Sequence, residues 1–374
     1  MIYRFTEHIA RALVLVAVPI MVLSCQNAPR PVETDGQEGL VPIVLYSGIQ
    51  IEEETRATSA TGPVEAWSSL KDDLRIYGIE RNADGLDVTG GRYIDDKQVP
   101  PPEEGTSKLD LFYRVLGGEK QLYSYVHLKK YDFFAYYAAN AGIGIKNYDA
   151  QTQTVSFDVT IDGSQDVMMA YADKVEDTKD SDIEPGEAYS DQSARHGVHP
   201  LLRFSHQLCR MIFRIRDSKP QEQADVYSLI MTDARIESRS RATMAVVRPD
   251  AAAYNGFTPI GDPEFLPVWY WEEEEFRHVS ERPVDLDGEF KDLGEVMVMP
   301  GEQTYILRIT VKQSNYHLTE TVDIDVPIDF GKETEPGYIY KVSVSFRGRE
   351  TVTSTVSMEP WKDQHGSFQL DPDV

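Results

Sequence analysis

The chain has 374 residues and a formal net charge of −25 at pH 7, with 62 acidic residues against 37 lysines and arginines. Because a surface this acidic repels a polyanion, the composition excludes nucleic acid as a partner. The length suits two domains of ordinary size better than one core. The 20 tyrosines and 14 phenylalanines favour pleated sheet over helix.

The first 24 residues have the pattern of a signal peptide. Arg4 and Arg11 precede an apolar run over residues 12–23. A membrane-spanning helix needs roughly 20 apolar residues, so this run predicts a removable leader and not a permanent span.

The leader ends at Ser24-Cys25, and this junction resembles the bacterial lipobox. The resemblance implies that Cys25 is lipidated and begins the mature chain, with its acyl chains holding the protein at a membrane surface. A plain secretory signal with a cysteine nearby by chance is the alternative. If Cys25 is lipidated, only Cys209 remains as a free thiol, and no intrachain disulfide can form.

Residues 25–40 are polar and without periodicity, which indicates a tether. From about Val41 onward, short runs alternate apolar and polar residues between turns, the pattern of antiparallel sheet. The first strand places large aliphatic side chains on one face, namely Ile43, Leu45, Ile49 and Ile51. Further strands of this half are expected at residues 74–79, 109–115, 121–128, 131–138, 155–161 and 166–172.

Residues 173–200 lose all apolar alternation and predict a linker or long surface loop. A second series of strands is expected at residues 201–215, 226–236, 243–247, 295–299, 304–312, 319–326, 338–346 and 351–358. The Pro- and acid-rich stretch 248–294 between them is expected to be a long excursion. The predicted fold is all-β, with two tandem antiparallel β-sandwich domains at residues 41–195 and 196–374.

Several short sequence motifs occur along the chain in a fixed order. Glu54-Thr55-Arg56-Ala57-Thr58 follows the first strand, and the aromatic segment 131–137 reads Tyr-Asp-Phe-Phe-Ala-Tyr-Tyr. Later motifs lie at residues 166–170, 202–208, 298–301, 337–340 and at Trp361. Together they resemble the fimbrillin-like lipoproteins that build type V pili, although Ala138 stands where that family often has proline after the aromatic strand.

The resemblance implies transthyretin-like sandwiches, export to the outer membrane as a lipoprotein, and assembly with other pilus subunits into a fimbrium. In stalk subunits of that family a protease cuts after an arginine behind the first strand, and a neighbouring subunit supplies the replacement; Arg56 occupies the matching position. Loss of four buried aliphatics would cost on the order of 10 kcal/mol, which a donor strand can recover. Alternatively, Arg56 is a surface arginine that is never cut, as in anchor subunits.

The C-terminal tail is a candidate donor strand. Phe368, Leu370 and Val374 alternate with polar residues, but Pro372 interrupts the pattern and tolerates only an unpaired or edge position. The alternative is a disordered acidic end. In that case the chain fits a tip or accessory subunit, which receives a strand and passes none on.

Two clusters could suggest metal ions. His196 and His199 with His206 lack a further ligand, and a core or interface histidine is the favoured interpretation of His206. The acidic run at residues 180–184 resembles the start of a calcium loop, but Pro185 stands where glycine is needed. We therefore expect no metal and no cofactor.

Trp269 and Trp271 precede four consecutive glutamates at residues 272–275. Flat rings beside carboxylates could contact a glycan, which supports the alternative function of a cell-surface glycan-binding lipoprotein associated with nutrient uptake. The favoured interpretation is a strand that leads into an acidic turn. No nucleophile elbow or phosphate-binding loop is present, so we expect no enzyme. The leading hypothesis is a structural or adhesive fimbrial subunit, whose partners include a ligand on a host or bacterial surface.

Overall fold

The computed structural model describes residues 40–49, 74–102, 107–109, 111–116, 119–139, 141–172, 186–218, 228–252, 256–272, 275–314, 319–347 and 351–360. Within these ranges the helical elements are α1 (Asp191–Arg195) and the 3-10 helix η3 (Val279–Glu281). Neither is long and apolar enough to cross a membrane. The remaining elements are strands, so the all-β prediction is confirmed.

Two sheets form the first β-sandwich. The nine-stranded sheet contains β4 (Arg92–Val99), β3 (Gly85–Leu86), β2 (Leu74–Asn82), β8 (Lys130–Ala138), β12 (Val167–Ala172), β14 (Leu201–His206), β1 (Leu45–Ile49), β5 (Lys108–Leu109) and β13 (Tyr189–Ser190). The five-stranded sheet contains β10 (Asn147–Asp149), β11 (Thr154–Thr160), β9 (Gly142–Ile143), β17 (Arg241–Val247) and β18 (Phe257–Ile260). Their facing side chains share a core in which the rings of Tyr136 and Phe157 lie 5.0 Å apart.

The nine-stranded sheet also buries its second face. All residues from Tyr131 to Tyr137 are buried, since alternate side chains of β8 enter two different clusters. The second cluster is rich in tyrosine, with the rings of Tyr93 and Tyr131 5.4 Å apart. This double burial explains why the strand lacks an apolar-polar alternation.

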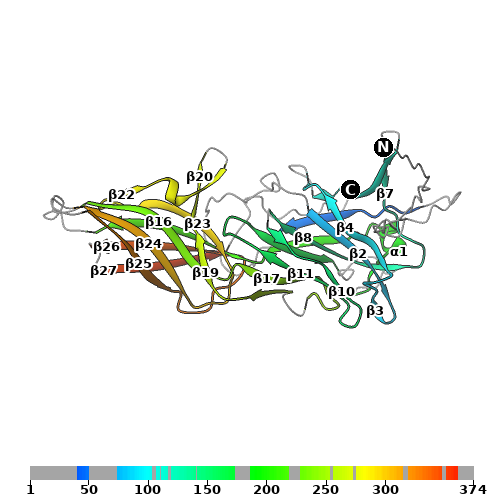
Figure 1. Ribbon diagram of the computed structural model, residues 1–374. Coiled ribbons are helices and arrows are strands. Elements are labelled where there is room, and N and C mark those ends of the chain that lie inside the picture. Colours follow the sequence, from blue (N-terminus) through cyan, green and yellow to red (C-terminus); the bar gives the residue numbers. More distant parts are fainter. Residues whose placement is uncertain are drawn as a thin grey trace, which may run out of the picture.

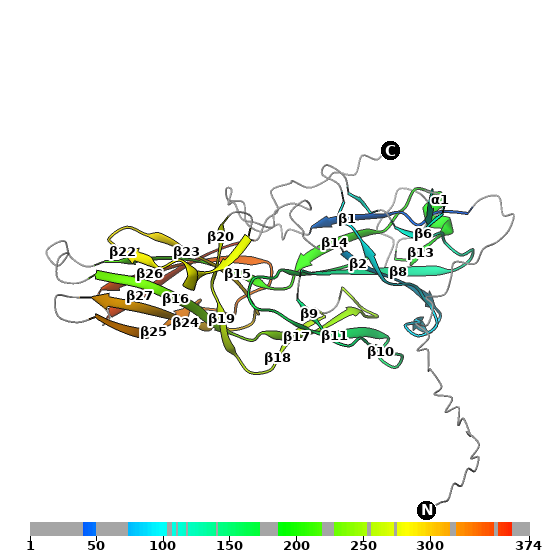
Figure 2. The same ribbon diagram turned by 45° about the horizontal axis from the view of Figure 1, so that its top comes forward.

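Two more sheets form the second β-sandwich. The six-stranded sheet contains β21 (Glu275–His278), β20 (Trp269–Glu272), β23 (Lys291–Val298), β15 (Cys209–Asp217), β26 (Tyr338–Arg347) and β27 (Thr351–Pro360). The five-stranded sheet contains β19 (Glu264–Pro267), β16 (Ser228–Ser238), β22 (Val284–Leu286), β24 (Thr304–Ser314) and β25 (Thr319–Asp329). Figures 1 and 2 show the two sandwiches arranged end to end in an elongated molecule.

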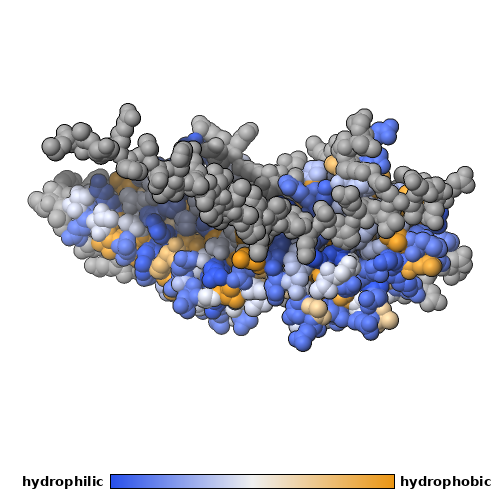
Figure 3. All heavy atoms as spheres, turned by 45° about the vertical axis from the view of Figure 1, so that its right-hand side comes forward, coloured by the Kyte–Doolittle hydropathy of each residue, from blue (hydrophilic) through white to orange (hydrophobic). Residues whose placement is uncertain are grey.

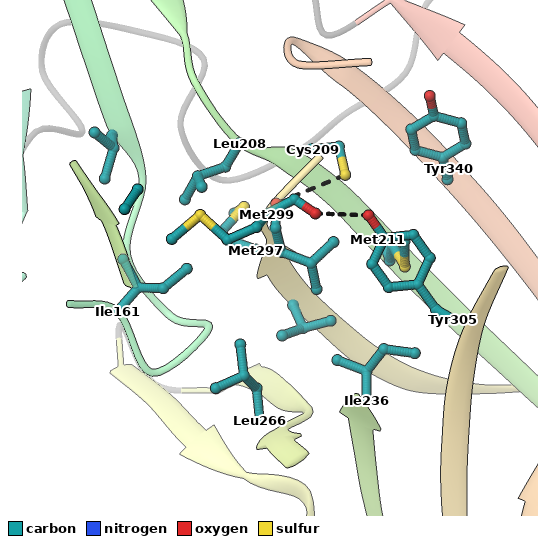
Figure 4. Close-up of a cluster of buried hydrophobic side chains, with 14 of the residues drawn as sticks. Ile161, Leu208, Cys209, Met211, Ile236, Leu266, Met297, Met299, Tyr305 and Tyr340 are labelled. Atoms are coloured by element: carbon teal, nitrogen blue, oxygen red, sulfur yellow. Dashed lines mark hydrogen bonds between the residues drawn. The ribbon is translucent and has the colours of Figure 1, made fainter. Parts of the chain in front are cut away.

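One hydrophobic cluster continues from the first sandwich into the second (Figure 4). In the second sandwich, the Tyr305 hydroxyl donates to the Met299 carbonyl at 2.6 Å. The loop after β11 meets β23, where the Met297 N–H donates to the Gly163 carbonyl at 2.7 Å. Gly163 has φ +94, and a Cβ there would lie 2.5 Å from Val296 Cγ2, so this contact requires glycine.

Most of the described surface in Figure 3 is hydrophilic, with hydrophobic residues scattered over it. This agrees with the formal charge of −25. Scattered single hydrophobic residues are ordinary for a folded protein and indicate no large apolar patch on the described part of this face.

Several expectations for individual segments are wrong. The expected strand at 121–128 ends at Leu122 as part of β7 (Glu119–Leu122). Residues 109–115 form no single strand: β5 pairs with β1, whereas β6 (Phe112–Leu116) folds onto β7 (Glu119–Leu122). Residues 186–200 are not linker, because β13 pairs with β8 and Ala194 of α1 is buried. The expected excursion at 248–294 contains β18 to β22 and the start of β23, most of them paired within the sandwiches.

The sheets do not follow the order of the strands in the sequence. The strands β14, β17 and β18 all come after residue 196, yet they join sheets that hold strands from before residue 195. Strands distant in sequence therefore complete the first sandwich. The domain boundary between residues 195 and 196 stays a prediction.

Candidate functional site

The strand β1 lies between two strands that come later in the chain. It pairs in parallel with β14, with Tyr46 opposite Leu201, and antiparallel with β5. The Tyr46 N–H donates to the Pro200 carbonyl at 3.0 Å, and the Ser47 N–H donates to the Ser107 carbonyl at 2.8 Å. The ladder is short, with four parallel pairs to β14 and two antiparallel pairs to β5.

The residues before β1 continue the same path as a loose extension. The Ile43 N–H donates to the Tyr123 carbonyl at 2.7 Å, and the Tyr125 N–H donates to the Val41 carbonyl at 2.9 Å. Pro42 forms an isolated antiparallel bridge with Ser124. The segment 41–49 is therefore held by backbone contacts with three separate parts of the chain, residues 107–109, 123–125 and 200–204.

Side-chain burial is the main feature of this segment. Ile43 is 2% exposed and Leu45 is 0% exposed, and both belong to the tyrosine-rich cluster. Ser47 is also buried, and its hydroxyl donates to the Ser107 carbonyl at 3.2 Å. Ile49 ends β1, but its side chain and all of Ile51 lie outside the described residues. The inward-facing residues of the described part are therefore two aliphatic residues followed by one small residue, at every second position: Ile43, Leu45 and Ser47.

Tyr46 points to the other side and its ring packs at a tilt of 51° against His199, with ring centroids 5.9 Å apart. Burial, and then the positive charge of Lys108 on β5, hold the pKa of His199 below its ordinary value. The Nδ1 atom of this ring is buried without a hydrogen-bond partner in the structure as described. His199 therefore favours its neutral form beside β1.

The three histidines of the sequence motif do not come together as a metal site. His196 is exposed after α1, whereas His206 is buried with its Nδ1 2.9 Å from Asp166 Oδ2. His206 is thus a core histidine, as favoured from the sequence. Over the described ranges, no group of three or more potential metal ligands is found.

The two tryptophans have different environments. The Trp269 Nε1 atom donates to the Asp162 carbonyl at 3.2 Å, and its ring lies edge-on to His278, so this side chain is part of the fold. Trp271 is 45% exposed on the hairpin of β20 and β21, which projects from the sandwich in Figure 1. Of the two, Trp271 is the one accessible to a ligand.

Several predicted site residues lie outside the described residues. They are Cys25, Arg56 and the tail residues Phe368, Leu370 and Val374. Their roles stay predictions. Sequence reasoning identified Ile43 and Leu45 but missed Ser47 and His199, because neither a serine in a strand nor a histidine near a turn signals a contact with β1.

The fold and the site define an all-β protein in which a short first strand is held mainly by its buried side chains. The sequence matches the fimbrillin-like family over residues 55–361, and the chain belongs to this family. This membership makes it a protein of cell-surface fimbriae and adhesion. No curated protein matches the sequence.

Solved structures of similar proteins span nearly the whole described chain. A candidate cell adhesion protein of Bacteroides uniformis is 16% identical, with a TM-score of 0.45 over 87% of this chain and 100% of that one. A candidate cell adhesion protein of Bacteroides ovatus is 14% identical, with a TM-score of 0.44 over 87% and 99%. The fimbrial anchor protein Mfa2 of Porphyromonas gingivalis is 10% identical, with a TM-score of 0.33 over 86% and 98%.

Proposed function

We propose that this chain is a lipid-anchored precursor of a fimbrial subunit, and that removal of its first strand opens a groove for a strand of another subunit. The anchor is Cys25 and the cut follows Arg56. The observation that carries the proposal is the contrast within β1, where the inward side chains of Leu45 and Ser47 are buried while the backbone pairs over only a few residues.

The energetics of β1 suit an exchangeable strand. Burial of Ile43 and Leu45 is worth about 1.5 to 3 kcal/mol for each side chain. Their removal would leave an apolar groove beneath the position of β1, which water solvates poorly. An incoming extended segment can restore both the main-chain hydrogen bonds and the buried side chains.

The groove also specifies what a donor strand must carry. Two aliphatic side chains must occupy the positions of Ile43 and Leu45, and a small side chain must follow at the position of Ser47. A one-residue slip would point the wrong side chains inward, so the pattern fixes the register. The tail places Phe368 and Leu370 at the same two-residue spacing, with Pro372 at the third position.

The position of the cut is consistent with the family match, which begins at residue 55 and leaves β1 outside. The test is limited digestion of the chain from residue 26 onward with a trypsin-like protease. We expect one dominant cut after Arg56, followed by oligomers that survive mild detergent. The matched control Arg56→Gln should resist that cut and stay monomeric under the same conditions.

Two outcomes would contradict the proposal. One is a cut after Arg56 that leaves a stable monomer with β1 still bound. The other is equal oligomer formation by the Arg56→Gln variant, which would make the cut irrelevant to assembly.

A further inference from the structure

A strand at the edge of a sheet exposes unpaired N–H and C=O groups, so soluble proteins protect their edges. Most edge strands of this protein have such protection. The strands β5, β10 and β21 have two to four residues, while β18 and β19 are equally short and contain Pro259 and Pro267. The longer edge strand β4 is bulged opposite β2 and contains Asp95, Asp96 and Lys97.

The two edges on the open side of the second sandwich differ sharply. The strand β25 contains Pro327 and three exposed aspartates, Asp323, Asp325 and Asp329. The strand β27 pairs with β26 over its whole length without a bulge, and its sequence is Thr-Val-Thr-Ser-Thr-Val-Ser-Met-Glu-Pro. Its charge and its proline come only at the last two positions. Within the described ranges, no strand pairs with its other edge.

Apolar side chains accompany this open edge. Val352 and Val356 point to the core but are only partly buried, and Met358 on the same face is 44% exposed. The opposite face carries Thr353, Thr355 and Ser357, all exposed. A regular strand with a half-covered apolar face and a hydroxyl face is suited to receive another strand.

We propose that β27 binds β27 of a second copy, antiparallel and centred on Thr355, which joins the two six-stranded sheets into one. The sequence is self-complementary in this register. Thr353 comes opposite Ser357 on the hydroxyl face, and Val352 comes opposite Met358 on the apolar face. Each Glu359 comes opposite position 351, so the two carboxylates stay roughly 27 Å apart, eight residues along the strand.

This contact differs in kind from the strand exchange proposed above. An isologous contact uses the same surface on both copies and closes after two, whereas head-to-tail exchange continues indefinitely. Pairing through β27 would therefore join two subunits side by side and needs no cut after Arg56. In an assembled fimbrium it would bring two fibres together laterally.

Charge repulsion between the two copies opposes this pairing, so the dependence of dimerisation on salt concentration tests it. Each copy carries a formal charge of −25, and the acidic strand β25 lies beside β27, where the Ser354 hydroxyl donates to the Pro327 carbonyl at 3.3 Å. Salt screens repulsion between copies but leaves backbone hydrogen bonds and apolar contacts largely intact. Association through β27 should therefore strengthen as salt rises. A contact limited to one strand edge is small, and we expect a weak dimer with a dissociation constant on the order of 10 to 100 μM.

The test is sedimentation equilibrium of the Arg56→Gln chain from residue 26 onward, which cannot enter the cleavage-dependent route. We expect a monomer–dimer equilibrium whose dissociation constant falls at least threefold between about 50 and 500 mM NaCl. Thr355→Lys places two ammonium groups opposite each other at the centre and should weaken dimerisation at least tenfold. Thr258→Lys makes the same exposed change on β18 and should have no effect.

The thermal unfolding midpoints of both lysine variants should equal that of the Arg56→Gln parent, since Thr355 and Thr258 are exposed. Hydrogen exchange should show that alternate amides of β27 become protected as the protein concentration rises. A monomer at every concentration and salt level would overturn the proposal. So would a dimer that weakens with salt, or one that Thr355→Lys leaves unchanged.

Discussion

The first strand, β1, and the last described strand, β27, are held in opposite ways. Four pairs link β1 to β14 and two link it to β5, but Ile43 and Leu45 beside them are 2% and 0% exposed. The strand β27 pairs with β26 over its full length, yet its side chains from Val352 to Pro360 are half-buried or exposed. Side chains hold β1 in place, whereas the backbone ladder holds β27.

This difference decides what each strand can do. A strand held by a few buried side chains leaves an apolar groove when it departs, and a similar strand can fill that groove. A strand held by its ladder stays in the fold and presents its second edge to a partner. The same molecule can thus combine a replaceable strand in one sandwich with a permanent docking edge in the other.

The largest expected difference between the two strands concerns core truncation. Leu45→Ala should lower the free energy of unfolding by about 3 kcal/mol, because Leu45 is fully buried and its removal leaves a cavity. Val356→Ala, the corresponding truncation of a smaller aliphatic side chain on β27, should cost about 1 kcal/mol or less, because Val356 is only partly buried. Urea unfolding of the two variants measures both values. Equal losses would mean that β1 depends on its side chains no more than β27 does.

A smaller expected effect is a pH dependence of local stability that is confined to the surroundings of β1. The pKa of His199 lies below the ordinary 6.5 because of burial and Lys108, so the folded protein resists a proton that the unfolded chain accepts. Stability near β1 is therefore fully present above pH 6.5 and is lost as the pH falls through the lowered pKa of the folded state. The groups that face this ring are the Tyr46 ring and the Lys108 ammonium.

Hydrogen exchange of the Tyr46 and Ser47 amides, corrected for intrinsic rates, checks this prediction. Between about pH 7.5 and 5.5 we expect their protection to fall more than that of β27. His199→Phe keeps a flat ring against Tyr46 but cannot titrate, and its protection should be independent of pH in this range. If the protection of these amides falls equally with pH in the His199→Phe variant, groups other than His199 cause the pH dependence.

Local sequence patterns predicted the strands whose two faces differ. Val155, Phe157 and Val159 alternate with polar residues, and they form one buried face of β11 as expected. The aromatic segment of β8 does not alternate, because both faces of its sheet are covered. The sequence still predicted a strand at residues 131–138, although these residues show no such alternation.

The arrangement of strands in the sheets could not be predicted from such patterns. The parallel pairing of β1 with β14 joins residues about 155 positions apart, and no local signal near Tyr46 points to Leu201. The split between β5 and β6 depends in part on such a distant partner, because β5 pairs with β1, whereas β6 pairs with β7 in a local hairpin.

The candidate site was accessible to sequence reasoning only in part. Ile43 and Leu45 were found because large aliphatics at alternate positions indicate a buried face. Ser47 was missed because its burial depends on a hydrogen bond to the Ser107 carbonyl from another part of the chain. His199 was considered from the sequence only as part of a disfavoured metal motif, whereas its ring packs on Tyr46.

The most direct test of the replaceable first strand is complementation with a peptide. The chain is cut after Arg56, the released segment is removed under mild denaturant, and a synthetic peptide of residues 40–51 is added during refolding. We predict that one peptide binds per chain and prevents oligomers from forming, whereas the same peptide with Leu45→Asp does neither. Oligomer formation that the unmodified peptide leaves unchanged would contradict the account, because assembly would then not use the groove of β1.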